Sequence, residues 1–282
     1  MKNESILKMK INANRIRSRI ITTVLDYGDG HAGPSLSCTD ILSVLYNGVM
    51  NIDEKNPKSP DRDYFILSAG HKCLALYATL IERGYEDESV MQTYNRLDTK
   101  VPGHPDEQKF RGVDFSTGSL GHGLPLACGV ATAMKLKNRM NRVFVLMGDG
   151  EQGEGSVWES ASFASHHKLD NIIAIVDRNH LQINGTTEQI QSIEPLKERY
   201  KAFGWSVKTV DGNNIEELYE ALYSLPFKKN KPSLIIANTI KGKGLSFAEN
   251  NVDYHHWNPK DPKEIAMARA DARKLDEEVF TL

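Results

Sequence analysis

Residues 148–155 form a glycine-rich segment, GDGEQGEG, directly after the apolar run RVFVLM. A sharp turn between a strand and a helix presents backbone N–H groups, which commonly bind phosphate. The segment also satisfies the G-x-G-x-x-G pattern of dinucleotide-binding folds. In such a fold the carboxylate of Asp149 would lie beside a pyrophosphate, where like charges about 4 Å apart repel unless a divalent cation separates them. The turn therefore predicts a phosphate site that includes a metal ion.

A second apolar run, residues 171–176, leads to further metal ligands. Asn179 follows it closely, so we expect its amide oxygen at the same edge of a sheet as Asp149. Leu181 can offer its main-chain carbonyl if the chain is extended there. Mg²⁺ prefers such oxygen ligands, and Ca²⁺ or Mn²⁺ can substitute for it. The spacing alone leaves open that Asp149 and Asn179 only cap turns and helices.

Four of the nine histidines directly follow a glycine: His31, His71, His104 and His122. Glycine lets the backbone and the imidazole ring approach a ligand closely. An imidazole donates hydrogen bonds to phosphate or hydroxyl oxygens and moves protons near neutral pH. A single histidine of this kind is usually an ordinary turn residue, whereas four of them indicate a ligand-binding cleft.

The elements that position these residues follow an α/β pattern, with a mostly parallel sheet and helices on both faces. Buried strands are predicted at residues 64–67, 142–147, 171–176, 206–210 and 233–238. Helices are predicted at residues 71–83, 124–137, 157–167, 195–203 and 215–225, with an amphipathic helix at the N-terminus. We expect a single domain over residues 1–282, with a core at about 10–245 and a C-terminal tail.

The composition excludes several classes of partner. A formal net charge of −2 with interspersed signs does not favour nucleic acid or a membrane surface. No apolar run approaches the roughly 20 residues of a membrane span, and no signal peptide is evident. The three cysteines form no Cys-x-x-Cys pair, which favours a reducing compartment over a zinc site or a disulfide framework. We expect a cytoplasmic protein.

Several motifs occur in the order in which transketolases carry them, and the chain resembles the N-terminal, thiamine-diphosphate-binding part of that family. The motifs are GDGHAGPSLSCTDIL, DRDYFILSAGHKCLALYA, VPGHPD, FSTGSLGHGLPLACGVA, GDGEQGEGSVWES, VDRNHLQINGTT and TIKGKGLSFAENNVDYHHW, and they span nearly all of the chain. The resemblance implies a thiamine-diphosphate-binding domain with thiamine diphosphate and Mg²⁺ as cofactors. The implied reaction transfers a two-carbon ketol unit from a ketose phosphate to an aldose acceptor, as in pentose phosphate and related carbohydrate metabolism.

The resemblance also implies roles for single residues. His31 and His104 would face the reacting end of the ketose, and His255 would reach the diphosphate and the reaction centre, although His256 beside it leaves a one-residue ambiguity. The residues implied to contact the cofactor are His71, Gly118, Leu120, Gly150, Glu154, Asn179, Lys241 and His255, and those implied to hold the metal are Asp149, Asn179 and Leu181.

Other matched positions are less specific. Glu154 matches a glutamate in a carboxylate and water network that joins the two active sites of a transketolase dimer, but the helix dipole would favour a glutamate there in any case. Lys243, in the same KGKG segment as Lys241, fits a solvated basic loop as well as it fits a contact to the diphosphate. Ala69 stands where many transketolases have Lys, His122 where full-length members commonly have Gln, and Pro34 where some have a small hydroxyl residue. These departures bear on cofactor affinity and substrate preference.

The resemblance covers only the first of the three domains of full-length transketolases. The glutamate that contacts the aminopyrimidine ring of the cofactor belongs to another domain, so we expect an α2β2 heterotetramer with a separate C-terminal subunit. Two alternatives stay open: a subunit of a related enzyme, such as deoxyxylulose-phosphate synthase or a 2-oxoacid dehydrogenase, and a non-catalytic cofactor-binding subunit. The sequence leaves the sugar donor and acceptor open.

Overall fold

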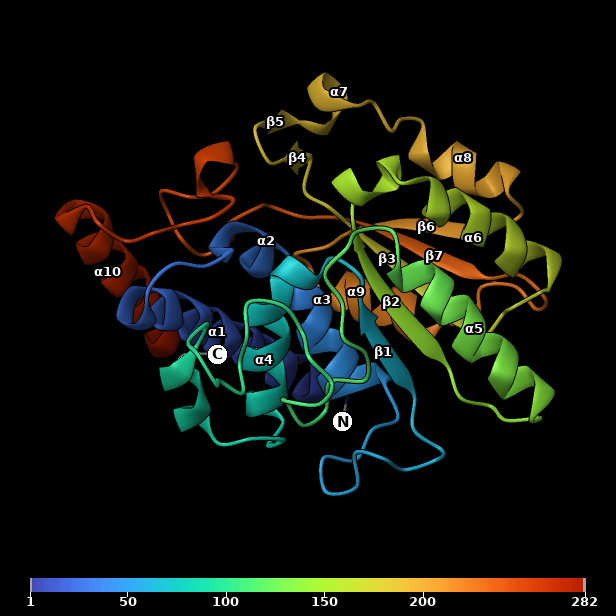
Figure 1. Cartoon of the computed structure of the whole chain (residues 1–282), viewed down its shortest axis with the longest axis horizontal. Coiled ribbons are helices and arrows are strands. Elements are labelled where there is room, and N and C mark those ends of the chain that lie inside the picture. Colours follow the sequence, from blue (N-terminus) through green and yellow to red (C-terminus); the bar gives the residue numbers. More distant parts are fainter. Residues whose placement is uncertain (1, 281–282) are drawn as a thin grey trace.

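The computed structural model describes residues 2–280, and within this range five parallel strands form a central sheet (Figure 1). The strands lie in the order β1-β2-β3-β7-β6, with β1 at Tyr64–Leu67, β2 at Val143–Gly148, β3 at Ile172–Arg178, β7 at Ser233–Asn238 and β6 at Ser206–Asp211. Each of the five predicted strands is confirmed, and the mostly parallel α/β fold is confirmed with them.

Both faces of the sheet are covered, because successive residues of each strand point to opposite sides. In β2, Phe144 and Leu146 pack into one hydrophobic core, whereas Val143, Val145 and Met147 pack into the other. A strand buried on both faces needs apolar residues at every position. This requirement explains why the sequence of β2 shows no alternation of apolar and polar residues.

The helices divide between the two cores, and Figure 1 shows α5 and α6 on one side of the sheet and α1, α3 and α4 on the other. The first core takes α1 (Lys2–Tyr27), α2 (Ala32–Ser37), α3 (Thr39–Val44), α4 (Cys73–Glu82) and α9 (Ile215–Tyr223). The second takes α5 (Gly123–Leu136), α6 (Gly155–His166) and α8 (Leu196–Ala202). Within residues 2–280, no helix is both long and apolar enough to cross a membrane.

The chain beyond residue 245 packs into the first core, past the range of about 10–245 that the sequence suggested. Helix α10 (Pro262–Glu278) lies against α1 and buries Ala268, Ala272 and Leu275. Asp261 caps its N-terminus and Pro262 begins it, as is common for helices. Two of the three buried side chains are alanines, so the apolar face is narrow and its pattern in the sequence is weak.

The carboxyl ends of the parallel strands meet at one edge of the sheet, where ligands bind in such folds. The register pairs Gly148 of β2 with Asp177 of β3, and Asp177 in turn with Ala237 of β7. The segments that leave β1, β2, β3 and β7 therefore converge. They carry the predicted site residues from His71 to Lys241.

Candidate functional site

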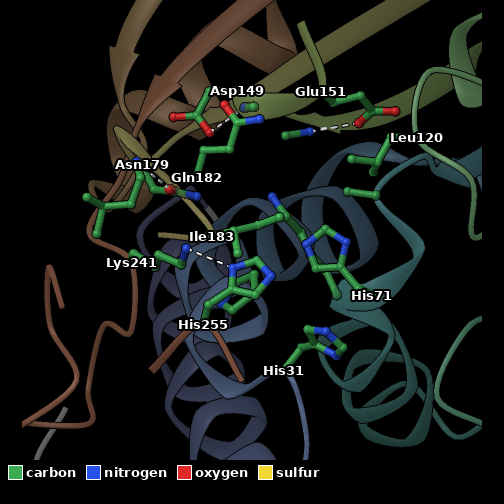
Figure 2. Close-up of a pocket in the computed structure, with 16 residues that line it drawn as sticks. His31, His71, Leu120, Asp149, Glu151, Asn179, Gln182, Ile183, Lys241 and His255 are labelled. Atoms are coloured by element: carbon green, nitrogen blue, oxygen red, sulfur yellow. Dashed lines mark hydrogen bonds between the residues drawn. The ribbon is translucent and has the colours of Figure 1, made fainter. Parts of the chain in front are cut away.

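A cavity of about 180 Å³ lies at this edge of the sheet (Figure 2). Nine of the predicted site residues line it: His31, His71, Leu120, Asp149, Gly150, Asn179, Leu181, Lys241 and His255. Seven further residues complete its wall: Pro34, Ala69, Lys72, Gly148, Glu151, Gln182 and Ile183. The cavity thus brings together residues that lie up to 224 positions apart, from His31 to His255.

Three predicted site residues do not line the cavity. His104 and Gly118 are exposed neighbours, since a β-carbon at Gly118 would lie 3.6 Å from Cδ2 of His104. The ring of His104 lies 6.4 Å from that of His31, so it stands beside the cavity. Glu154 is exposed at the N-terminus of α6. Their roles stay predictions.

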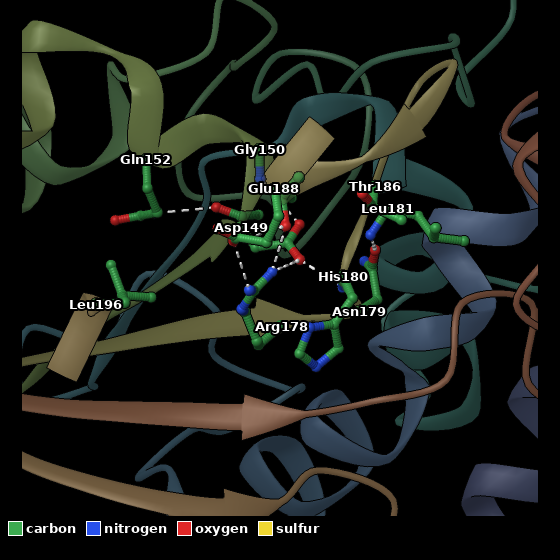
Figure 3. A network of polar contacts seen from close by, with 12 residues as sticks. Asp149, Gly150, Gln152, Arg178, Asn179, His180, Leu181, Thr186, Glu188 and Leu196 are labelled. Carbon is green, nitrogen blue, oxygen red and sulfur yellow. Dashed lines mark hydrogen bonds and ion pairs between the residues drawn. The ribbon is translucent and has the colours of Figure 1, made fainter. Parts of the chain in front are cut away.

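Asp149 directly follows β2, and its buried carboxylate is held by three donors (Figure 3). Oδ1 accepts from the backbone N–H of Gly150 at 2.8 Å. Oδ2 accepts from the backbone N–H of His180 at 2.6 Å and from Nη1 of Arg178 at 3.1 Å. His180 has a φ of 65°, a conformation that is uncommon outside glycine and is concentrated at functional sites. Burial, followed by the charge of Asp177, raises the pKa of Asp149.

The side chain of Asn179 is also fixed by its partners. Its Nδ2 group donates to Oγ of Ser37 at 3.3 Å and to Oδ2 of Asp177 at 3.4 Å, while Oδ1 accepts from the backbone N–H of Leu181 at 3.2 Å. This pattern assigns the amide orientation. Oδ1 can accept a second time, so it could serve as an oxygen ligand just after β3, the strand beside β2.

This donor set fits a hard divalent cation. Within residues 2–280, no group of three or more His, Cys, Asp or Glu side chains could hold a metal. A metal at this edge would instead combine the carboxylate of Asp149 with the amide oxygen of Asn179, the carbonyl of Leu181 and oxygens of a bound ligand. Mg²⁺ is commonly held by one or two carboxylates together with phosphate oxygens and water.

Arg178, the last residue of β3, ties the metal turn to the segment that follows. Besides Asp149, it binds Thr187 at 2.6 Å, Glu188 at 3.1 Å and Glu194 at 3.0 Å. The guanidinium group is buried, whereas both glutamates are more than two-fifths exposed. Arg178 therefore compensates the buried charge of Asp149 and orders the segment around β4 (Leu181–Gln182), β5 (Gly185–Thr186) and α7 (Thr187–Ile190).

A second buried ion pair lies beneath the cavity. Nζ of Lys72 donates to Oδ2 of Asp177 at 2.6 Å, and the two side chains are 2% and 0% exposed. The hydroxyls of Ser37 and Thr239 donate to the same carboxylate. Burial, the largest single effect, would lower the pKa of Lys72, but the charge and the hydrogen bond of Asp177, together with smaller contributions from neighbouring groups, raise that pKa overall. Lys72 is therefore a cation at neutral pH.

Glu151 connects the metal turn to the loop that precedes α5. Its carboxylate accepts from the hydroxyl of Ser68, from the backbone N–H of Gly121 at 2.7 Å and from that of Gly148 at 3.0 Å. Burial raises the pKa of Glu151, and these hydrogen bonds oppose the rise. The carboxylate of Glu151 thus joins the chain at the ends of β1 and β2 to the loop before α5.

Histidines gather at the other end of the cavity. The ring of His31 lies 5.3 Å from that of His71, 5.5 Å from that of His255 and 4.7 Å from that of His256. His255 and not His256 lines the cavity, and its Nδ1 accepts a hydrogen bond from Nζ of Lys241 at 2.9 Å. The proton of the neutral His255 ring then resides on Nε2.

The lining imidazoles are neutral at physiological pH. Burial, followed by the charges of neighbouring histidines and lysines, lowers the pKa of His31 to about 4, of His71 to about 2 and of His255 to about 3. Burial and the charge of Lys72 lower the pKa of Lys241 to about 8. Neutral imidazoles can accept protons from hydroxyl groups, and the lysines can bind anions.

The cavity consequently has two ends of different chemistry. We call Lys72, Asp149, Glu151 and Asn179 the floor, and His31, His71, His104, His255 and His256 the histidine rim. The floor suits a phosphate group bound through a metal ion. The histidine rim suits proton transfer and hydrogen bonds to hydroxyl groups.

Comparison with known proteins identifies this combination of fold and site. Residues 8–281 match the family model described as transketolase, thiamine diphosphate binding domain. The chain belongs to the transketolase family. Family membership and the thiamine diphosphate binding domain expected from the motifs are thereby confirmed.

Two curated transketolase relatives resemble the chain over nearly their whole length. A 6-deoxy-6-sulfo-D-fructose transketolase subunit of Clostridium sp. (strain MSTE9) is 41% identical, with 90% of this chain and 92% of the relative aligned. An apulose-4-phosphate transketolase subunit of Actinobacillus succinogenes is 42% identical, with 94% and 96% aligned. Both names describe subunits.

Solved transketolases share the fold. The transketolase of Campylobacter jejuni superimposes with a TM-score of 0.83 at 29% identity, covering 98% of this chain and 46% of that chain. This chain therefore spans less than half the length of the solved transketolase.

The sequence did not single out some of the residues that organise the site. Lys72, Glu151, Asp177 and Arg178 were absent from the prediction. A signal for two of them exists, since Asp177 and Arg178 end an otherwise apolar strand, and charged residues are seldom fully buried unless they are paired. Lys72 gives no such signal, because a lysine at the start of a helix usually reaches solvent.

Proposed function

We propose that this chain is the N-terminal subunit of a transketolase that transfers a two-carbon ketol unit from a ketose phosphate to an aldose acceptor. The observation that carries the proposal is one cavity in which the metal turn of Asp149 and Asn179 faces the neutral histidines His31, His71 and His255. The family match supports it. A non-catalytic subunit would not need this arrangement.

The floor would hold the cofactor through its diphosphate. Asp149, Asn179 and the Leu181 carbonyl would bind Mg²⁺, or Ca²⁺ or Mn²⁺ in its place, and Gly150 permits close approach at the turn. Thiamine diphosphate, when bound, supplies the electron sink for the carbanion that ketose cleavage leaves. His71, which belongs to the histidine rim, and Lys241 would contact the cofactor from that end of the cavity.

The histidine rim would handle the protons of the sugar. Cleavage of a ketose requires a proton to leave a hydroxyl group, and transfer to the acceptor requires a proton to return to oxygen. His31, His104 and His255 are the residues we assign to these steps. Lys241 holds Nδ1 of His255, so this ring presents its Nε2–H to a substrate oxygen.

A second subunit would complete the site. The cavity of about 180 Å³ is smaller than the roughly 300–1,000 Å³ of typical ligand pockets. Gly118 and Glu154, implied to serve the cofactor, are exposed in this chain. A separate C-terminal transketolase subunit that covers them, in an α2β2 heterotetramer, would explain both features, and the two curated relatives are themselves named as subunits.

The proposed function also bears on the substrates and the cellular compartment of this chain. We propose sugar phosphates or closely related sugars as substrates, with neither nucleic acid nor membrane as a partner. The three cysteines are buried and free, which fits a reducing cytoplasm.

The test is to mix the purified chain with its C-terminal subunit, then to measure ketol transfer among sugar phosphates. We expect activity that requires thiamine diphosphate and Mg²⁺ and that neither polypeptide shows by itself. Decarboxylation of pyruvate without ketol transfer would instead identify a related thiamine-diphosphate enzyme. Cofactor binding without turnover of either kind would identify a non-catalytic subunit.

A further inference from the structure

Lys72 is a buried cation that lines the cavity and uses one of its three donors. It is 2% exposed, and its one hydrogen bond within residues 2–280 runs to Asp177 at 2.6 Å. An ammonium group carries three N–H donors, and buried donors normally find partners. Two donors of Lys72 are therefore available to a group inside the cavity.

The position of this ammonium group is beside the metal turn. A β-carbon on Gly148, the residue before Asp149, would lie 3.7 Å from Nζ of Lys72 and 3.9 Å from the β-carbon of Ala69. Lys72 thus delivers a positive charge close to position 69, where many transketolases have a lysine and this chain has alanine. It does so from one turn further along, at the start of α4.

A second lysine brings another positive charge to the cavity that Lys72 lines. Lys241 lines the same cavity, and burial together with the charge of Lys72 lowers the pKa of Lys241 to about 8. Two buried cations in one small cavity repel each other, and a buried ion pair such as Lys72–Asp177 seldom adds stability over apolar side chains. A bound anion would relieve the repulsion and occupy the free donors of Lys72.

We infer that Lys72 is a further cofactor-binding residue, whose ammonium group donates to the diphosphate of thiamine diphosphate. This inference rests on the proposed function. Asp177 is the positioning residue of Lys72, since it anchors the ammonium group and is itself fixed by the hydroxyls of Ser37 and Thr239.

The test compares thiamine diphosphate with thiamine monophosphate, because a contact to the diphosphate affects the first ligand more than the second. Calorimetry measures both affinities with Mg²⁺ for the assembled complex of this chain with its C-terminal subunit. We expect Lys72→Met to weaken binding of thiamine diphosphate about ten- to a hundredfold, the loss of a charged hydrogen bond, and to reduce the preference over the monophosphate.

Lys243→Met is the matched control. Lys243 is 38% exposed, lies 3.9 Å from Glu249 and does not line the cavity. The Lys243→Met variant loses one positive charge, as Lys72→Met does, so it reports any general effect of net charge on the affinity. We expect it to retain the affinity and preference of the unmodified complex.

An unchanged preference in folded Lys72→Met would overturn the inference. If that variant does not fold, the double variant Lys72→Met/Asp177→Asn, which removes both buried charges, is measured in its place. A reduced preference for thiamine diphosphate is again expected, and an unchanged preference would again contradict the inference. Failure of the unmodified complex to bind thiamine diphosphate would instead refute the proposed function. The two failures are thereby distinguished.

Discussion

The floor and the histidine rim of the cavity are built in different ways. The four floor side chains are almost completely buried, and each is held by partners within this chain. In the histidine rim, His104 and His256 are exposed, and within residues 2–280 only His255 makes a side-chain hydrogen bond, to Lys241. The floor side chains are fixed by partners within this chain, whereas the rim is a cluster of rings with open sides.

This difference indicates what a single chain can do. A floor whose donors and acceptors are held in fixed directions by this chain loses little conformational freedom when it binds a diphosphate and its metal ion. In the half-open rim, the exposed imidazoles of His104 and His256 are accessible to water, which competes with substrate for hydrogen bonds. Changes to the floor should therefore affect cofactor binding, and changes to the rim residues that face the sugar, such as His31, should affect turnover.

The largest expected effect is at the centre of the floor. Asp149→Ala removes the only carboxylate of the proposed metal site, so we expect Mg²⁺-dependent binding of thiamine diphosphate to fall by more than about a hundredfold. Calorimetric titration measures the affinity, and circular dichroism checks the fold. Asp26→Ala, at an exposed ion pair with Arg269, is the matched control. Retained Mg²⁺-dependent affinity in Asp149→Ala would contradict the metal assignment.

Arg178→Met probes the ion pair that supports the floor. The change leaves the carboxylate of Asp149 without its cationic partner, so the free energy of unfolding should fall by about 3 kcal/mol. Mg²⁺ with thiamine diphosphate supplies another cation at this carboxylate, so it should raise the melting temperature more in the variant than in the unmodified chain. Thermal unfolding with and without both ligands measures this difference.

The control for that measurement is Arg269→Met, which breaks an exposed pair and should change stability by less than about 1 kcal/mol. An equal ligand-induced rise in the Arg178→Met variant and the unmodified chain would show that Asp149 and the metal ion do not interact as proposed.

A change at His31 in the histidine rim is expected to affect turnover and not the affinity for the cofactor. In the assembled complex, His31→Ala should reduce kcat by about a hundredfold, the lower part of the range for a lost acid–base group, while the affinity for thiamine diphosphate changes little. Steady-state kinetics and calorimetry give the two quantities. His166→Ala, at the exposed end of α6, should leave both unchanged. A parallel loss of cofactor affinity in His31→Ala would erase the distinction between floor and rim.

The smallest effect concerns pH. The lowered pKa values of His31, His71 and His255 mean that these rings are neutral in the folded chain and bind protons more readily when it unfolds. Their contribution to stability is complete above pH 6.5 and is lost as the pH falls toward the folded pKa values of about 2 to 4.

His71→Asn removes the most strongly shifted of these groups. Because asparagine does not titrate, the free energy of unfolding of this variant should fall less steeply than that of the unmodified chain between pH 6.5 and 5. Denaturant unfolding at several pH values gives both slopes. Identical slopes would mean that His71 is not buried as a neutral ring.

The sequence predicts the strands well for a physical reason. Residues 64–67 and 233–238 were predicted with the bounds that β1 and β7 have, because buried parallel strands require uninterrupted β-branched and apolar residues. Helices α2 and α3 were not predicted. Each has six residues and is buried throughout, so neither has a polar face that would reveal a helical period.

The site residues likewise divide into those that a local motif predicts and those that only the fold brings together. Asp149, Asn179 and the histidines belong to motifs that are visible in the sequence, and most of them line the cavity. The pairing of Lys72 with Asp177 joins residues 105 positions apart, and that of Arg178 with Asp149 depends on the register of β2 and β3. Such contacts form only when the sheet is assembled, so no local sequence pattern predicts them.

The measurement that tests the central claim most directly is a calorimetric titration of thiamine diphosphate into an equimolar mixture of this chain and its C-terminal subunit, with and without Mg²⁺. We predict saturable binding with Mg²⁺ and a large loss of affinity when the metal is removed by a chelator. Binding that is indifferent to the metal, or no binding at all, would contradict the assignment of Asp149 and Asn179 to a metal-bound diphosphate site.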